Sequence, residues 1–286
     1  MNYLNGYELA NLIKDALKED IATRDITTEL LVPKGLDLTA RLVAREDMVA
    51  CGISVAAKAF RLLDKNMQFK PLIKDGQRIK KNSVLAVIRG NARAILTAER
   101  VALNFLSLLS GTATQTRLFV EAIKPYKTKI IDTRKTIPGL RLLQKYAVRC
   151  GGGYNHRFTL DEMILVKDNH LDIIKGLHNL RRIGSRLKTE IEVRDLNELK
   201  LALTLKPDVV MLDNMSVKDM RKAVLIRQGA LRLRSGQARR KILFEASGNI
   251  NLGNVKKVAA TGVDIISVGS LTHSVDSADI SLDIKI

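Results

Sequence analysis

Basic and acidic side chains follow short apolar runs at many places in the second half of the chain. The cations of this set are Arg134, Lys135, Arg157 and Lys167, and the carboxylates are Glu192 and Asp213. Arginine and lysine bind dianionic groups through charge-assisted hydrogen bonds. Paired carboxylates beside phosphates most simply bind Mg²⁺ or ribose hydroxyls. The set therefore predicts a site for a ligand with several negative charges.

Glycine-rich turns accompany these charges. They are GGG at 151–153, SGN at 247–249 and VGS at 268–270. Backbone N–H groups of such turns bind phosphate when they lie at the start of a helix. The sequence contains no evident Ser–His–Asp or Cys–His arrangement, so covalent acyl transfer lacks a nucleophile. The turns therefore favour phosphate binding over covalent catalysis.

Each of these features also has a purely structural interpretation. A Lys or Arg at a strand end is more often a solvated charge or an ion-pair partner, and GGG taken alone indicates only a turn. His156 and His170 are equally open to a structural role, with their ring nitrogens satisfied inside the fold. The repetition of charge at successive strand ends favours the functional interpretation.

Length and charge limit the possible partners. The chain has 286 residues, enough for about two domains, and a formal net charge of +18. This charge favours nucleic acid, an acidic membrane or a polyanionic small molecule. Aromatic residues are only 4% and Trp is absent, which disfavours stacking on single-stranded nucleic acid. The N-terminal segment lacks a continuous apolar stretch and Cys51 and Cys150 are expected to be reduced, so we expect a cytoplasmic protein that does not bind membranes.

The first third of the chain predicts a small α/β domain. Helical spacing of apolar residues predicts helices at 8–18 and 54–63. Apolar or alternating runs predict strands at 36–44, 67–73 and 83–88. A further helix, capped by Thr97, is apolar on nearly every face and is expected to be buried. This cap would place Arg100 in the first turn, where the helix dipole disfavours a cation unless an anion lies nearby.

The chain from residue 129 onward predicts repeated β–α units. Its short apolar runs are KIIDT, MILVKD, TEIEVR, VVMLDN, KILFEAS and DIISVGS. Such a rhythm is typical of a parallel sheet, and in a β/α barrel the carboxyl ends of all strands open on one face. No GxGxxG follows any of these runs, which disfavours a dinucleotide-binding sheet. The charged strand ends are therefore expected to converge on one site.

The motifs DTRKT, GGGYNHR and KDNH within 130–170 closely resemble the quinolinate phosphoribosyltransferase family. Further matches are LTAERVALNFLSLLSGTAT at 96–114, EIEV at 190–193, VVMLDNMS at 209–216, FEASGNI at 244–250 and TGVDIISVGSLTHS at 261–274. The resemblance spans nearly the whole chain in the expected order. It implies an N-terminal α/β sandwich domain at 1–106, to which 274–286 returns, and an incomplete α/β barrel with parallel strands at 107–273.

The resemblance also implies a reaction. Members of this family transfer phosphoribose from phosphoribosyl pyrophosphate to quinolinate in the presence of Mg²⁺. They release pyrophosphate and CO₂ and form nicotinate mononucleotide for NAD biosynthesis. The sandwich domain packs over the barrel of a neighbouring subunit, so the family's active site is complete only in a homodimer or a higher oligomer.

Carried over by motif, the resemblance assigns catalytic roles to Lys167, Glu192 and Asp213, and makes the two carboxylates the Mg²⁺ ligands. The substrate-binding residues would be Arg100, Thr133, Arg134, Lys135, His156, Arg157, Lys167, Ser247, Gly248, Asn249, Gly269, Ser270 and His273. Arg100 would reach quinolinate from the partner subunit. The turn at 247–249, with Gly269 and Ser270, would bind the 5′-phosphate.

Two other interpretations remain open from the sequence. A related pyrophosphorylase-like protein associated with molybdenum transport shares the fold, but intact Arg134, Arg157 and Lys167 favour quinolinate. A basic nucleic-acid-binding protein could use the segment 227–241, which is rich in arginine and contains no acid. No recognition helix, zinc finger or RNA-binding motif supports nucleic acid as a partner. We expect the segment itself to be a solvated insertion loop.

Overall fold

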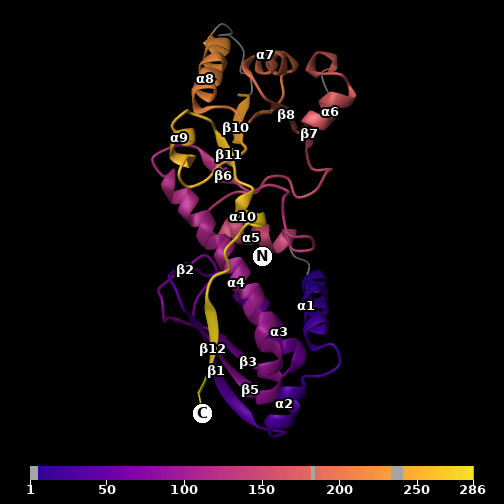
Figure 1. Cartoon of the computed structure of the whole chain (residues 1–286), viewed down its shortest axis with the longest axis vertical. Coiled ribbons are helices and arrows are strands. Elements are labelled where there is room, and N and C mark those ends of the chain that lie inside the picture. Colours follow the sequence, from indigo (N-terminus) through magenta and orange to yellow (C-terminus); the bar gives the residue numbers. More distant parts are fainter. Residues whose placement is uncertain (1–5, 182–183, 233–240, 286) are drawn as a thin grey trace. The chain divides into compact units, whose positions relative to one another are not determined.

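The computed structural model describes residues 6–181, 184–232 and 241–285. It divides into two compact units (Figure 1). Unit 1 comprises the chain up to Arg117, Thr136–Gly152 and the C-terminal segment from Leu271, and unit 2 comprises Leu118–Lys135 and Gly153–Ser270. The boundary predicted after residue 106 lies inside a helix, α4 (Ala92–Ala122). The division into 1–106 and 107–273 stays a prediction.

Unit 1 is built on an antiparallel sheet whose strand order is β12-β1-β5-β3. The strands are β1 (Asp37–Ala44), β3 (Gln68–Pro71), β5 (Val84–Asn91) and β12 (Ile280–Lys285). Ala40, Leu42 and Ala44 alternate along β1 and are each fully buried, as expected for a strand with one face on a core. A separate two-stranded ladder joins β2 (Met48–Val49) to β4 (Arg78–Ile79).

Helices supply the other half of the core of unit 1. They are α1 (Gly6–Ile21), α2 (Ile26–Leu31), α3 (Ile53–Leu63), α4 and α5 (Arg141–Cys150). Ile13, Phe60 and Leu106 are fully buried and belong to one apolar cluster with the sheet. Gly151 ends α5 so close to α4 that a Cβ would lie 2.5 Å from the carbonyl oxygen of Ala113. At least this glycine of the GGG run therefore has a packing role.

Helix α4 corrects one expectation. It begins at Ala92 rather than after Thr97, so Arg100 lies in the third turn and the helix dipole gives no argument for an anion beside it. Thr97 does not cap the helix; its hydroxyl donates instead to Asp25 Oδ2 at 3.0 Å. Helix α4 is long and apolar enough to cross a membrane. Of the 18-residue stretch that meets this criterion, however, 56% is buried inside the protein, as in the core helix of a globular protein.

Unit 2 is built on a six-stranded parallel sheet with the order β6-β11-β10-β9-β8-β7. The strands are β6 (Lys129–Ile131), β7 (Ile164–Val166), β8 (Thr189–Val193), β9 (Val209–Asp213), β10 (Leu243–Ser247) and β11 (Ile265–Ser267). All six predicted runs form strands. Among the described residues β6 and β7 do not pair with each other, so the barrel is incomplete, as expected.

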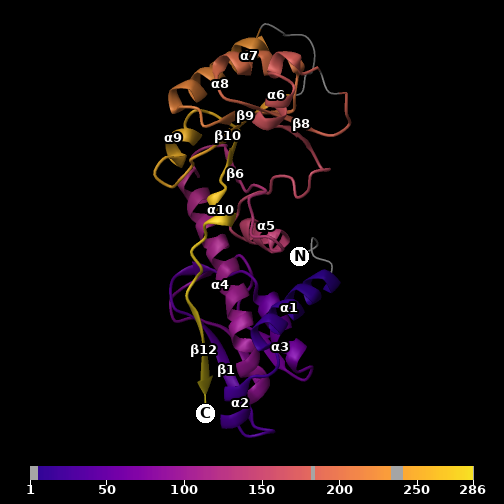
Figure 2. The ribbon, with the colours of Figure 1, turned by 45° about the vertical axis from the view of Figure 1, so that its right-hand side comes forward.

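Short helical segments connect these strands. They are α6 (Asp168–Ile173), the 3₁₀ turn η1 (Leu177–Asn179), α7 (Leu196–Leu205), α8 (Val217–Arg232) and α9 (Val255–Ala259). Helix α7 packs against β8 and β9 and beside α8 (Figure 2). A last short helix, α10 (Ser270–His273), follows β11. The β–α rhythm directs every strand of the sheet the same way and gathers the carboxyl ends along one edge.

The basic segment 227–241 was expected to be a solvated loop, and this is wrong for its first part. Helix α8 includes its residues as far as Arg232, and Arg227 is only 6% exposed. The Arg227 guanidinium pairs with Asp264 and lies over the Phe244 ring, 4.6 Å from its centroid. Lys241 Nζ lies 2.5 Å from Asp264 Oδ1. Residues 233–240, with Arg234, Arg239 and Arg240, lie outside the described residues.

Candidate active site

The strand ends of unit 2 carry most of the predicted site residues. Thr133, Arg134 and Lys135 follow β6, and Lys167 follows β7 and precedes α6. Glu192 lies in β8, Asp213 and Ser247 end two adjacent strands and are register partners, and Gly269 and Ser270 follow β11. Because the six strands are parallel, these residues all lie toward one edge of the sheet.

The carboxylates of Glu192 and Asp213 form the acidic part of this edge. Glu192 is 8% exposed. Burial raises the pKa of Glu192, the negative charge of Asp213 raises it further, and the positive charge of Lys167 opposes both. Two carboxylates that lie this close together form a suitable donor set for a hard divalent cation. These two residues therefore fit Mg²⁺.

Two guanidinium groups form the basic part. Arg157 is half-buried, and its Nη1 donates to the carbonyl oxygen of Met163 at 2.7 Å. Burial lowers the pKa of Arg157 and the nearby charge of Arg134 lowers it further, whereas Glu190 opposes both. The Nε of Arg157 is buried and makes no hydrogen bond within the described residues. Two like charges brought together in this way favour an anion as their ligand.

The turn after β10 has a conformation that requires glycine. Gly248 has φ +91°, and a Cβ there would collide with the side-chain amide of Asn214. Asn249 Nδ2 donates to Asn214 Oδ1 at 3.0 Å, and Asn214 Nδ2 donates to Asp213 Oδ2 at 2.9 Å. These bonds fix the turn at 247–249 relative to Asp213. No role for Asn214 was predicted from the sequence, although it directly follows the predicted carboxylate Asp213.

Arg100 and His273 belong to unit 1. Arg100 is exposed, and its Nη2 lies 4.0 Å from Glu99 Oε1, at the limit of an ion pair. His273 is also exposed, and its Nδ1 is 2.6 Å from Ser274 Oγ. His170, by contrast, has a local structural contact, because its Nδ1 accepts the backbone N–H of Lys167 at 3.0 Å. Lys167 itself keeps its side chain exposed.

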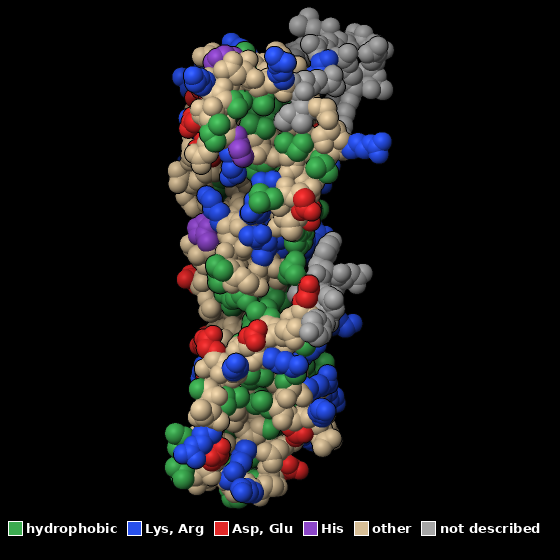
Figure 3. All heavy atoms as spheres, turned by 90° about the vertical axis from the view of Figure 1, so that its right-hand side faces the viewer, with side chains coloured by type: hydrophobic (Ala, Val, Ile, Leu, Met, Phe, Trp, Pro, Cys, Tyr) green, Lys and Arg blue, Asp and Glu red, His purple; other side chains and the backbone are tan. Residues whose placement is uncertain are grey.

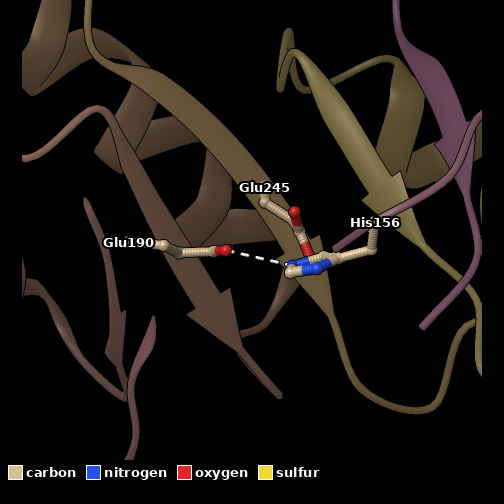
Figure 4. A group of neighbouring side chains, drawn as sticks. All are labelled: His156, Glu190 and Glu245. Atoms are coloured by element: carbon tan, nitrogen blue, oxygen red, sulfur yellow. Dashed lines mark hydrogen bonds and ion pairs between the residues drawn. The ribbon is translucent and has the colours of Figure 1, made fainter. Parts of the chain in front are cut away.

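Glu190 and Glu245 are functional candidates that sequence analysis missed. Figure 4 shows their side chains converging on His156, whose Nε2 lies 3.0 Å from Glu190 Oε2. One ligating atom from each of the three lies within 4.8 Å of the others. Both glutamates are 1% exposed inside the apolar strands β8 and β10. A carboxylate within a buried strand is rare unless it is paired, and this was the available signal.

Comparison with known proteins matches both halves of the chain. The model for the N-terminal domain of quinolinate phosphoribosyl transferase matches residues 25–110, and that for its C-terminal domain matches 112–283. A probable nicotinate-nucleotide pyrophosphorylase (carboxylating) from Synechocystis is 42% identical over 278 residues, covering 94% of this chain and 90% of the relative. The corresponding Mycobacterium leprae protein is 40% identical over 281 residues, covering 95% of each.

Solved structures agree with this assignment. The nicotinate-nucleotide pyrophosphorylase from Francisella tularensis is 44% identical, with a TM-score of 0.88 and coverage of 99% of this chain and 98% of that one. NadC from Streptococcus pyogenes is 35% identical, with a TM-score of 0.89 and the same coverage. These matches confirm the mixed α/β fold and the resemblance drawn from the motifs. The chain belongs to the quinolinate phosphoribosyltransferase family.

Proposed function

We propose that the protein transfers the phosphoribosyl group of phosphoribosyl pyrophosphate to quinolinate and forms nicotinate mononucleotide, pyrophosphate and CO₂ in NAD biosynthesis. Relatives named as carboxylating nicotinate-nucleotide pyrophosphorylases support this reaction. The observation that carries it is the grouping of Arg134, Lys167, Glu192 and Asp213 at the carboxyl ends of strands of one sheet, with Arg157 near Arg134. Such a site suits two substrates that are both multiply anionic.

The reaction requires charge stabilisation more than covalent catalysis. The bond from ribose C1 to pyrophosphate breaks with its electron pair on pyrophosphate, while the quinolinate ring nitrogen forms the new bond to C1. The carboxyl group next to that nitrogen leaves as CO₂, and a proton replaces it on the ring carbon. Positive charge therefore develops on the sugar and negative charge on the leaving group, so fixed cations and carboxylates lower the barrier by electrostatic stabilisation.

We assign the cations to the anionic groups of the substrates. Arg134 and Arg157, with Thr133, Lys135 and His156, would bind the carboxylates of quinolinate and the phosphates, and Lys167 would act near the reacting carbon. The backbone and side chains of Ser247, Gly248, Asn249, Gly269 and Ser270 would bind the 5′-phosphate. Gly248 suits this turn because it tolerates φ +91° and has no Cβ that would collide with the side chain of Asn214.

Glu192 and Asp213 would hold Mg²⁺ or the ribose hydroxyls. Mg²⁺, when bound, supplies positive charge that neutralises the pyrophosphate leaving group. The raised pKa of Glu192, caused by burial and by the charge of Asp213, supports this assignment because a cation relieves both effects.

We further propose a homodimer in the cytoplasm, in which Arg100 and His273 act in a site shared between subunits. The exposed position of Arg100, with a single marginal contact to Glu99 among the ion pairs of the described residues, leaves its charge available to a ligand. Cys51 and Cys150 are both free, which is compatible with a reducing compartment.

One assay tests the proposal directly. The purified protein is incubated with quinolinate, phosphoribosyl pyrophosphate and Mg²⁺, and nicotinate mononucleotide and CO₂ are measured. We expect both products in equal amounts, and none when nicotinate replaces quinolinate. Absence of product from folded protein would reject the proposed activity. Binding to duplex DNA that falls steeply with salt, without any turnover, would instead indicate a nucleic-acid-binding protein.

A further inference from the structure

Asn214 lies between two parts of the candidate site, the carboxylate of Asp213 and the turn at 247–249. It directly follows Asp213 at the end of β9, and its backbone N–H donates at 2.9 Å to the carbonyl oxygen of Ser247, the last residue of β10. Strands β9 and β10 are neighbours in the sheet, with Asp213 and Ser247 as register partners (Figure 2). The backbone of Asn214 therefore connects the predicted carboxylate to the first residue of the turn.

The hydrogen bonds of the Asn214 side chain fix the direction of its amide. A carboxylate only accepts hydrogen bonds, so the atom that lies 2.9 Å from Asp213 Oδ2 is the amide nitrogen of Asn214. The amide oxygen of Asn214 then faces Asn249, whose Nδ2 donates to it at 3.0 Å. The order of donation runs from Asn249 to Asn214, and from Asn214 to Asp213. One planar amide thus supplies a donor to the carboxylate and an acceptor to the turn.

The backbone conformation of both asparagines suits this arrangement. Asn214 and Asn249 each have φ +52°, in the left-handed region that asparagine and glycine tolerate best. On its other side the turn is attached to the start of α9, because Asn254 Nδ2 donates to the backbone oxygen of Asn249 at 2.9 Å. The turn at 247–249 is therefore held by Asn214 from β9 and by Asn254 from α9.

A ribose 5-phosphate group has to reach both parts of this edge at once. Its hydroxyls on C2 and C3 are assigned to the carboxylates, and its 5′-phosphate is assigned to the turn at 247–249. Neighbouring strands lie about 4.8 Å apart, which sets the distance between the two parts only coarsely. The hydrogen bonds of Asn214 set it finely. A site whose groups are held in place before binding loses less entropy when the ligand arrives.

We propose that Asn214 is a positioning residue that couples recognition of the two ends of the phosphoribosyl group. Its amide nitrogen orients the Asp213 carboxylate toward the sugar hydroxyls, and its amide oxygen holds the turn at 247–249 in place for the 5′-phosphate. The proposal rests on the proposed function for the identity of the sugar phosphate. It implies that Asn214 affects phosphoribosyl pyrophosphate and not quinolinate.

The binding of two sugar phosphates measures this coupling without turnover. The variant Asn214→Gly keeps the left-handed backbone and removes both side-chain hydrogen bonds, and its affinity for ribose 5-phosphate and 2-deoxyribose 5-phosphate is measured by isothermal titration calorimetry. Each lost bond costs about three- to tenfold in affinity. We expect binding of ribose 5-phosphate to weaken by about tenfold, and that of the 2-deoxy ligand by about threefold, because it lacks a hydroxyl for Asp213. Equal losses for the two ligands, or no loss for either, would overturn the proposal.

A double-mutant cycle tests the bond between the two asparagines. Asn249→Gly also keeps its backbone conformation, and it removes the group that donates to Asn214. In the Asn249→Gly background, Asn214→Gly should weaken binding of 2-deoxyribose 5-phosphate by less than about 1.5-fold, because the bond that holds the turn is already lost. Losses that multiply would contradict the coupling.

The matched control is Asn82→Gly, which alters an asparagine with φ +68° in unit 1. It introduces a glycine at a left-handed position outside the site, so we expect wild-type affinity for both sugar phosphates. A thermal melt of each variant shows that it is folded. A loss of affinity in Asn82→Gly as large as that in Asn214→Gly would overturn the proposal, because the effect would then follow from the added glycine.

Steady-state kinetics relates the binding results to the proposed reaction. Asn214→Gly should raise the KM for phosphoribosyl pyrophosphate by about tenfold, as expected for a residue that orients a ligand-binding carboxylate, and leave the KM for quinolinate within about twofold. An equal rise in both KM values would overturn the specific role of Asn214. An active wild-type protein with an unaffected Asn214→Gly variant would reject this inference alone. An inactive wild-type protein that binds ribose 5-phosphate through Asn214 as expected would reject only the proposed reaction.

Discussion

Lys167 is exposed at the carboxyl end of β7, where no apolar packing depends on its side chain. Lys167→Ala should therefore fold normally and lose most turnover. Removal of one electrostatic contact to a transition state costs about 3 kcal/mol, or roughly a hundredfold in kcat/KM. Steady-state kinetics and a thermal melt of the same preparation test this. Wild-type kcat/KM in the variant would remove Lys167 from the catalytic residues.

Glu192 and Asp213 differ from Lys167 in their expected kinetic effect. Glu192→Gln and Asp213→Asn keep side-chain size and remove charge, so the Mg²⁺ concentration for half-maximal activity should rise by about tenfold or more. The KM for phosphoribosyl pyrophosphate should rise with it, whereas that for quinolinate should change little. Titration of activity with Mg²⁺ measures the effect. Unchanged titration curves in both variants would leave the carboxylates with structural roles only.

The buried carboxyl group of Glu245 should make the stability of the folded protein depend on pH. Burial raises its pKa to about 8 from an ordinary value of 4.5, with Glu190 on β8 adding to the effect and His156 opposing it. As pH rises between these values, the unfolded chain loses a proton that the folded protein keeps, so the free energy of unfolding falls. Glu245→Gln cannot ionise and escapes this loss. The Tm of the variant minus that of the wild type should increase from about pH 5 to about pH 8. A flat difference would mean that Glu245 is not protonated when folded.

At the scale of the elements, α8 is attached to the sheet through Asp264, which accepts from Arg227 and Lys241. Although burial opposes it, hydrogen bonding from Lys241, the Phe244 N–H and Arg227 lowers the pKa of Asp264. Asp264→Asn leaves the Arg227 charge buried and should cost about 3 kcal/mol of unfolding free energy. Because the pKa of Asp264 is lowered by folding, this contribution is present above its ordinary pKa and is lost as pH falls through the folded value.

Urea denaturation at neutral pH measures the Asp264 effect, and Asp219→Asn is its control. Asp219 pairs with Lys222 on the exposed surface of α8 at 3.1 Å, and such a solvent-screened pair contributes little to stability. Equal losses in the two variants would show that the Arg227 pair is no more important than a surface contact.

The sequence predicted the strands of this fold better than its helix ends and buried charges. A parallel sheet is covered on both faces, so its strands are nearly continuous apolar runs such as VVMLDN. Such runs can be recognised in the sequence without knowledge of the tertiary structure. The start of α4 was mistaken because the helix already begins at Ala92, where Asn91 Oδ1 accepts the backbone N–H of Ala94. Thr97 lies inside the helix, and its hydroxyl donates to Asp25, which is distant in sequence. Arg227 looked solvated because its partner Asp264 lies in another β–α unit.

The site shows the same limit. Charges at strand ends could be predicted to gather along one edge because parallel strands share a direction. The pairing of Glu190 with Glu245 could not, because it depends on the order of the strands in the sheet, with β9 between β8 and β10. A sequence alone does not state that order.

The excess positive charge is a property of the whole molecule. On the face shown in Figure 3, Lys and Arg side chains are spread among other residue types instead of forming one continuous stripe. A charge distributed in this way raises the local concentration of anionic substrates. This arrangement agrees with the small-anion interpretation of the +18 net charge.

Subunit mixing tests the proposed homodimer. If Arg100 serves the site of the partner subunit, the inactive variants Arg100→Ala and Lys167→Ala should complement when their subunits exchange. Half of randomly paired dimers are mixed and each has one repaired site, so recovery reaches at most about a quarter of wild-type activity. Activity and native mass spectrometry of the mixture are measured together. No recovery despite observed exchange would place Arg100 in the site of its own subunit, or in none.

The pairing of β1 with β12 constrains the order in which the chain assembles. Thr39 is paired with Lys285, so β1 is synthesised long before this neighbour exists. Every strand of unit 2 leaves the ribosome in the interval, and each finds its neighbours within unit 2. Until β12 arrives, one edge of β1 has unpaired backbone groups, and such an edge promotes association with other chains. Loss of residues 280–285 would thus produce aggregation during synthesis while leaving the catalytic strands intact.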